Sequence, residues 1–135
     1  MKVISDDKKR VVNIGNSEYW HAVFSTIYGC IGQNMKKYPF ASFFLETGIC
    51  NYENGYRTAR DINHIRDSLA KFKPEEAVYD INDRKKKAPW EGKISEVITS
   101  CANYYTTADG GDLLYELVCI FCYAQIAKVS VRMEV

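Results

Sequence analysis

The sequence predicts an α+β fold: a small antiparallel or mixed sheet, with strands from both termini, packs against about four helices as a single pair of layers. Residues near both ends of the chain are β-branched or alternate between apolar and polar, which is typical of strands. Between them, apolar residues recur at the spacing of amphipathic helices. The length of 135 residues and the 47% hydrophobic composition suit one domain over residues 1–135.

The first elements follow from local patterns. Val11–Ile14 precedes the turn residues Gly15 and Asn16, so we expect a short strand there that pairs with Val3 and Ile4. Ser17 is a suitable N-cap for the first helix, with Glu18 in its first turn. The apolar face of this helix comprises Trp20, Val23, Phe24, Ile27, Tyr28 and Ile31.

Two further helices are expected before the middle of the chain. Pro39 can begin a short helix, and Gly48 is a natural end for it. A polar loop at Asn51–Gly55 separates it from a third helix, which Pro74 ends. The third helix is expected to turn inward Tyr56, Ala59, Ile62, Ile65, Leu69 and Phe72.

The region after Pro74 is harder to assign. Ala77–Ile81 alternates between apolar and polar residues, which predicts a strand, and Asn103–Thr107 is a candidate for another brief strand. Ile94–Cys101 fits either a short helix or an irregular packed segment.

The C-terminal region predicts a helix and then a strand. Asp109 or Asp112 would cap a long helix from Leu113 to Ala124 that is apolar on most of its faces, so this should be the central buried helix. Val129–Val135 alternates throughout and predicts the C-terminal strand. The first and last helices are expected to pack against the sheet.

Composition narrows the function. The formal charge is +1, from 18 basic and 17 acidic side chains, which gives no general attraction to nucleic acid or to an anionic membrane. No apolar run is long enough to cross a bilayer, and the N-terminus lacks a signal-peptide pattern, so we expect a cytoplasmic protein. Five cysteines at irregular spacing indicate reduced thiols.

Motifs for catalysis or metal binding are weak. Cys119 and Cys122 form a C-x-x-C in the middle of an apolar helix, which favours buried structural cysteines. His21 and His64 have no neighbouring nucleophile in the sequence. Asp109-Gly110-Gly111-Asp112 lacks the further carboxylates of a calcium loop. We therefore predict no catalytic residues, no metal and no cofactor.

The basic run Arg84–Lys87 lies close to Trp90, a pattern that nucleic-acid binders share. A run of four charges is more often a solvated loop, and acidic residues come just before it. Opposite charges side by side also suit a polar protein interface. The neighbouring acidic residues are Glu75, Glu76, Asp80 and Asp83.

An aromatic-rich connection is the strongest functional signal. Ala88–Ser95 and Asn103–Leu114 gather Trp, Pro, two Tyr and paired glycines, which is unusual for a plain linker. This composition indicates a surface that recognises a partner. The alternative is that Trp90 and Tyr104 are core residues that fix the loop to the domain. The candidate contact residues are Trp90, Tyr104, Tyr105, Asp83 and Asp109.

The chain also resembles the immunity protein 70 family of bacterial polymorphic-toxin systems. The resemblance rests on four pieces in order, spanning about Gly15 to Leu117, and the last piece is the most specific. The pieces are Phe24–Ile27, Lys37–Pro39, Ala88–Gly92 with Ile94-Ser95, and Asn103–Gly110 leading into Asp112–Leu114.

The resemblance implies a small cytosolic immunity protein that binds and neutralises a cognate toxin C-terminal domain, as in contact-dependent inhibition. It supplies no catalytic residues, and it implies a protein partner, with neither membrane nor nucleic acid expected. The near-neutral charge argues against mimicry of nucleic acid. The alternatives are a small cytosolic enzyme that uses Cys and His, or an RNA-binding module built on Arg84–Lys87.

Overall fold

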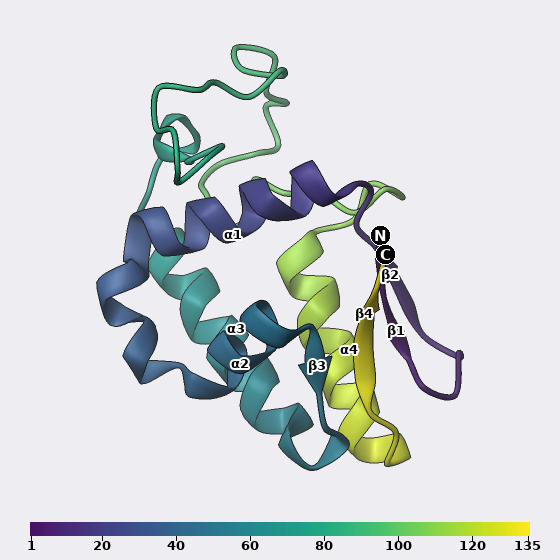
Figure 1. The fold of residues 1–135 in the computed structure, drawn as a ribbon. Helices are drawn as coiled ribbons and strands as arrows, with labels where there is room; N and C mark the ends of the chain where they lie inside the picture. Colours follow the sequence, from purple (N-terminus) through teal and green to yellow (C-terminus); the bar gives the residue numbers. More distant parts are fainter.

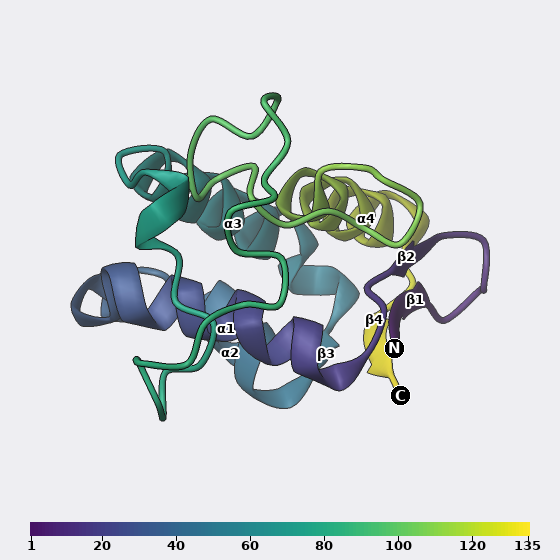
Figure 2. The same cartoon turned by 90° about the horizontal axis from the view of Figure 1, so that it is seen from above.

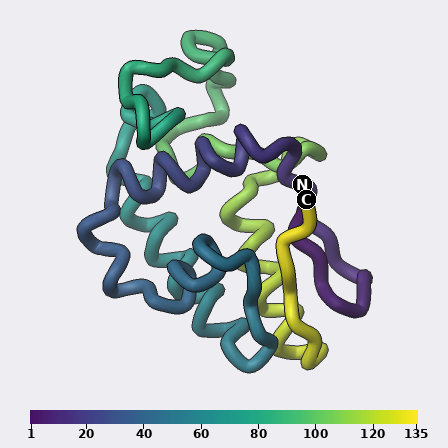
Figure 3. The backbone as a smooth tube through the Cα atoms, in the orientation of Figure 1, coloured from purple at the N-terminus to yellow at the C-terminus, as the bar shows by residue number.

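A computed structural model describes residues 1–135 and shows an α+β fold with one open sheet (Figure 1). The sheet has four antiparallel strands in the order β2-β1-β4-β3. Its strands are β1 (Lys2–Ser5), β2 (Val11–Asn13), β3 (Ile49–Cys50) and β4 (Val131–Glu134). The two terminal strands are paired at the centre, with Lys2 opposite Glu134, so the N- and C-termini lie side by side (Figure 3).

Four α-helices and three short 3₁₀ helices make up the rest of the regular structure. The α-helices are α1 (Ser17–Ile31), α2 (Pro39–Thr47), α3 (Gly55–Leu69) and α4 (Leu113–Ala127). The 3₁₀ helices are η1 (Gly32–Lys37), η2 (Tyr52–Asn54) and η3 (Pro74–Glu76). No helix combines the length and the apolar character needed to cross a membrane.

Helix α4 is the central helix, as its apolar sequence predicts. It lies along α3 and also contacts strands β2 and β4. Leu113, Leu117 and Phe121 are completely buried, and the Phe121 ring packs edge-on against Phe44 of α2 at 4.8 Å between centroids. Gly55 of α3 lets α3 and α4 approach closely, because a Cβ there would collide with the backbone of Phe121 of α4. Helix α1 packs mainly on α3, whereas we had expected it to cover the sheet.

The helix ends show which local signals are correct. Asn16, not Ser17, caps α1, since its side chain accepts from the backbone N–H of Tyr19 at 2.9 Å. Of the two candidates for α4, Asp112 is the cap. Gly48 ends α2 in a left-handed conformation with φ of 74°. The start of α2 is capped from a distance by buried Asp61 of α3, whose carboxylate accepts from Phe40 N (2.9 Å) and Ala41 N (3.2 Å).

Some predicted elements are wrong. Ala77–Ile81 is not a strand, because its backbone bonds to side chains of α1 and not to another strand. Asn103–Thr107 contains only an isolated bridge between Thr106 and Asp112. The third helix stops at Leu69 and leaves Tyr56 about half exposed. Strand β3 falls between the predicted second helix and the predicted loop. Ile94–Cys101 is the irregular packed segment that we gave as one of two options.

The β1–β2 hairpin is attached to α4 by Asp7, which gives a prediction about pH. Hydrogen bonds from the hydroxyls of Ser5 (2.6 Å) and Tyr123 (2.5 Å) and from Lys9 N (3.0 Å) lower the Asp7 pKa from 3.8 to about 2. Because the pKa of Asp7 is lower in the folded than in the unfolded chain, ionised Asp7 stabilises the fold. This stabilisation is fully present at pH values above the pKa of the unfolded chain. This stabilisation is lost as pH falls through the window from about 4 to about 2.

Urea denaturation at a series of pH values in this window measures the effect. In Asp7→Asn, stability should depend less on pH there than in the wild type. In Tyr123→Phe the window should narrow, because one donor to the carboxylate is lost. An identical pH dependence in the wild type and in Asp7→Asn would contradict the assignment.

Candidate functional site

The connection, which we define as residues 77–112, runs from η3 to α4 without regular secondary structure. It passes over α1 and returns to the start of α4 (Figure 2). A structureless segment of this length inside a compact domain is unusual and is often functional. The aromatic-rich pieces Ala88–Ser95 and Asn103–Leu114 both belong to it.

The first part of the connection is held on α1 by hydroxyl groups. Thr26 Oγ1 donates to the carbonyl oxygen of Val78 and accepts from its N–H, both at 3.0 Å. Ser25 Oγ accepts from Ile81 N at 3.0 Å. These two buried side chains satisfy backbone groups that would bond to a neighbouring strand if Ala77–Ile81 were a strand. Gly29 of α1 completes the fit, because a Cβ there would lie 2.7 Å from Val78 Cγ2.

A hydrogen-bond contact between side chains extends this attachment. His21 Nε2 lies 3.1 Å from Asp80 Oδ1, and the interaction with His21 lowers the pKa of Asp80 below its ordinary value. The other histidine, His64, is exposed on α3 and stacks on Tyr38 with 6.1 Å between ring centroids. No group of three or more His, Cys, Asp or Glu side chains is arranged to hold a metal ion.

Five aromatic residues form a cluster where the connection crosses α1. We call this the aromatic cluster, and it consists of Tyr19, Tyr79, Trp90, Tyr104 and Tyr105. The Trp90 ring packs against Tyr19 at 5.7 Å and Tyr79 at 5.6 Å between centroids. Tyr105 packs edge-on against Tyr19 at 5.5 Å and lies 4.8 Å from Tyr104. Such tilted and edge-to-face pairs are favourable aromatic geometries.

Tyr19, Trp90, Tyr104 and Tyr105 of the cluster also form hydrogen bonds. The Tyr105 hydroxyl donates to Ala22 O at 3.0 Å and lies 2.6 Å from Thr26 Oγ1, whose own proton goes to Val78 O. Trp90 Nε1 donates to the Tyr104 hydroxyl at 2.9 Å, and Tyr19 accepts from Thr106 N at 2.8 Å. Burial raises the pKa of both Tyr104 and Tyr105. The cluster is therefore a hydrogen-bonded unit that fixes the connection to α1.

The predicted contact residues divide into two groups. Tyr104 and Tyr105 are 8% and 3% exposed, so their rings are part of the core, whereas Trp90 is half-buried at its edge. Asp83 and Asp109 are exposed. Asp83 accepts from Lys85 N at 3.3 Å in the basic turn, and Asp109 accepts from Asn13 Nδ2 of strand β2 at 3.2 Å. The structure brings Trp90, Tyr104 and Tyr105 together and leaves the two aspartates at separate points of the connection.

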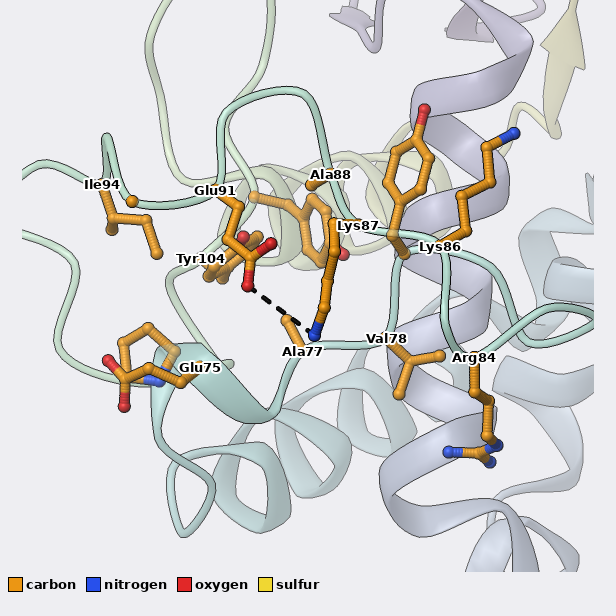
Figure 4. Close-up of a pocket in the computed structure, with 14 residues that line it drawn as sticks. Glu75, Ala77, Val78, Arg84, Lys86, Lys87, Ala88, Glu91, Ile94 and Tyr104 are labelled. Atoms are coloured by element: carbon orange, nitrogen blue, oxygen red, sulfur yellow. Dashed lines mark ion pairs between the residues drawn. The ribbon is translucent and has the colours of Figure 1, made fainter.

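A cavity of about 360 Å³ opens beside the aromatic cluster (Figure 4). Tyr104, Tyr105 and Ile94 form apolar parts of its lining, together with Ala77–Tyr79. Lys87 and Glu91 point toward one another, with 3.8 Å between Nζ and Oε1. The rest of the charged lining comprises Glu75, Arg84 and Lys86.

A second hollow of about 340 Å³ lies on the other side of Tyr79, which lines both. Trp90, Pro89 and Tyr19 line it, with Thr106–Ala108. Tyr19 and Tyr79 are not among the contact residues predicted from the sequence. Tyr19 stands in the first turn of a regular helix and Tyr79 in an assumed strand, so neither has a local pattern that sets it apart. An apolar and aromatic surface with two hollows and a mixed charged rim is suited to binding a protein.

Comparison with known proteins gives one family. Residues 4–133, nearly the whole chain, match the model of the family described as immunity protein 70. No curated protein and no solved structure matches the chain.

Proposed function

Because the chain belongs to the immunity protein 70 family, we propose that it binds and neutralises a cognate toxin in the cytoplasm of the cell that makes it. The toxin would be the C-terminal domain of a contact-dependent inhibition system or of a related polymorphic toxin. The observation that carries this proposal is the family match over residues 4–133. Neutralisation is by binding, without turnover of a substrate.

We place the toxin contact on the outer surface of the connection. Tyr104 and Tyr105 are buried and hold this surface in shape, while Trp90 is half-buried between them and solvent. A rigid aromatic side chain beside a hollow is a typical energetic centre of an interface, because it loses little entropy on binding. Asp83 and Asp109 are exposed on either part of the connection and would contribute charge at the rim.

The proposed contact would cover a small part of the chain's surface. A standard protein interface buries roughly 800 Å² on each partner. This is about a tenth of the 7681 Å² of accessible surface of the chain. A preformed surface also binds faster than one that must first fold, which matters for an inhibitor of a toxin.

The test is to express the toxin domain encoded beside the gene for this chain, alone and together with the chain. We expect growth to be rescued and the two proteins to elute as a stable complex. The proposal would be rejected if cells that contain both the toxin domain and soluble chain still failed to grow. It would also be rejected if rescue required turnover of a small molecule by the chain.

Removing charge from the rim gives a more specific prediction. Asp83→Asn and Asp109→Asn keep the oxygen that accepts the local hydrogen bond but remove the charge. We expect each to slow association with the toxin roughly 3- to 10-fold at low salt and to change dissociation little, as is usual for rim charges. Stopped-flow fluorescence at two ionic strengths measures both rates.

Glu46→Gln is the matched control, since Glu46 is exposed and belongs to α2, which lies on the other side of α1 from the connection (Figure 1). Its association rate should match the wild type. An equal slowing in all three variants would point to a general charge effect and not to this surface.

A further inference from the structure

Two cysteines that are distant in sequence meet at the base of the connection. Cys30 lies near the end of α1, and Cys101 lies in the second half of the connection. Cys101 Sγ donates to Lys73 O at 3.2 Å, and Cys30 Sγ donates to Glu76 O at 3.7 Å. These carbonyls belong to a single turn, η3 with its N-cap, which the bond from Glu76 N to Lys73 O closes at 2.9 Å. The two thiols are near enough for each to shift the pKa of the other.

We propose that Cys30 and Cys101 are an oxidation site, at which a small-molecule disulfide such as oxidised glutathione converts the two thiols into a disulfide that joins α1 to the connection. This proposal concerns the chain alone and does not depend on its having a toxin partner. The main chain around Cys101 is already fixed, because its N–H donates to Phe72 O at 3.0 Å. To join, the two sulfurs would leave the carbonyls of Lys73 and Glu76 by rotation of their side chains.

The surroundings of the two thiols indicate which of them reacts first with the oxidant. Cys30 is half-buried and reachable from solvent, whereas Cys101 is completely buried. The neighbouring Cys101 thiol lowers the pKa of Cys30, whereas the Cys30 thiol and burial raise the pKa of Cys101. Cys30 is thus the thiolate that attacks the oxidant, and Cys101 is the thiol that resolves the product.

The oxidation proceeds by two successive thiol–disulfide exchanges with one molecule of oxidised glutathione. The Cys30 thiolate attacks one sulfur of oxidised glutathione, breaks its S–S bond and releases one glutathione thiolate, which leaves a mixed disulfide on Cys30. Cys101 then loses its proton and attacks the Cys30 sulfur, which releases a second glutathione. In total the two cysteines lose two protons and two electrons, and one oxidised glutathione becomes two reduced molecules.

The other cysteines have different surroundings and serve as internal controls. Cys50 is buried, and its thiol bonds to Thr58 Oγ1 at 3.4 Å. Cys119 is exposed on α4, so the expectation that both cysteines of the C-x-x-C are buried is wrong. Cys122 is half-buried, and burial raises its pKa.

The test is to incubate the folded chain with excess oxidised glutathione and to analyse it by intact mass and by peptide mapping without reduction. We expect a loss of two hydrogens, a cross-linked peptide pair containing Cys30 and Cys101, and a midpoint of thermal unfolding that rises by roughly 10 °C. Dithiothreitol should reverse all three changes.

Variants separate this outcome from ordinary thiol chemistry. Cys101→Ala should stop at a single glutathione attached to Cys30, and Cys30→Ser should give neither product. If Cys101→Ala does not fold, Cys30→Ser at its half-buried position still provides the test. The double variant Cys119→Ser/Cys122→Ser should form the cross-link as the wild type does. A stable glutathione adduct on Cys30 in the wild type, or a cross-link confined to Cys119 and Cys122, would overturn the proposal.

Discussion

Replacement of Tyr105 by alanine is expected to lower the free energy of unfolding by roughly 3 to 5 kcal/mol, the usual cost of removing a large aromatic side chain from a core. Tyr105 is 3% exposed and packs on both Tyr19 and Tyr104. The truncation leaves a void beneath the connection and removes the hydroxyl that bonds with Thr26 Oγ1 and Ala22 O. Urea denaturation followed by circular dichroism measures the change.

Tyr105→Phe separates packing from hydrogen bonding. It keeps the ring and removes only the hydroxyl, so we expect a loss of about 1 to 2 kcal/mol. Limited proteolysis adds the location of the damage. If Tyr105 holds the connection on α1, cleavage in residues 77–112 of the alanine variant should precede cleavage elsewhere. A loss below about 1 kcal/mol for Tyr105→Ala would mean that the cluster is not a structural unit.

The aromatic cluster explains how an irregular segment can keep a defined shape. Regular strands satisfy their backbone through neighbouring strands, whereas Val78 and Ile81 rely on the hydroxyls of Thr26 and Ser25. The Tyr105 hydroxyl lies beside the first of these hydroxyls, 2.6 Å from Thr26 Oγ1. A connection fixed in this way can present side chains at its outer surface with little cost in conformational entropy on binding.

The regular part of the fold could be predicted because its signals are local. The period of apolar residues in Ser17–Ile31, the apolar run from Leu113 and the alternation near Val131 each determine one element directly. Strand β3 has only two residues and is specified by its pairing with β4, so no local pattern reveals it.

The candidate site could be predicted only in part. The composition of the connection drew attention to Trp90, Tyr104 and Tyr105, which the structure does bring together. Their partners Tyr19 and Tyr79 could not be found in this way, because the contacts join segments up to 87 residues apart. The same limit explains the wrong strand at Ala77–Ile81, where alternation reflects packing on a helix. Local patterns do not distinguish a helix from a strand as the neighbour of an extended segment.

Trp90→Ala is expected to weaken toxin binding by roughly 30-fold or more, as truncation of an aromatic interface centre commonly costs at least 2 kcal/mol. Trp90 is half-buried and lines the hollow beside Thr106–Ala108, so it has surface both for the cluster and for a partner. We also expect a moderate loss of stability, near 2 kcal/mol, because packing on Tyr19 and Tyr79 and the bond to the Tyr104 hydroxyl are removed. Calorimetric titration with the toxin domain, beside a denaturation curve, measures both quantities.

Trp20, the second tryptophan of the chain, provides the matched control. It is also half-buried, but it packs edge-on against Phe44 at 6.4 Å between centroids. Trp20→Ala should therefore lose a similar amount of stability while the folded protein keeps its affinity for the toxin. Equal affinity losses in the two variants would show that destabilisation alone weakens binding. An unchanged affinity in Trp90→Ala would contradict the proposal that the toxin binds the connection, because Trp90 is the only tryptophan on that surface.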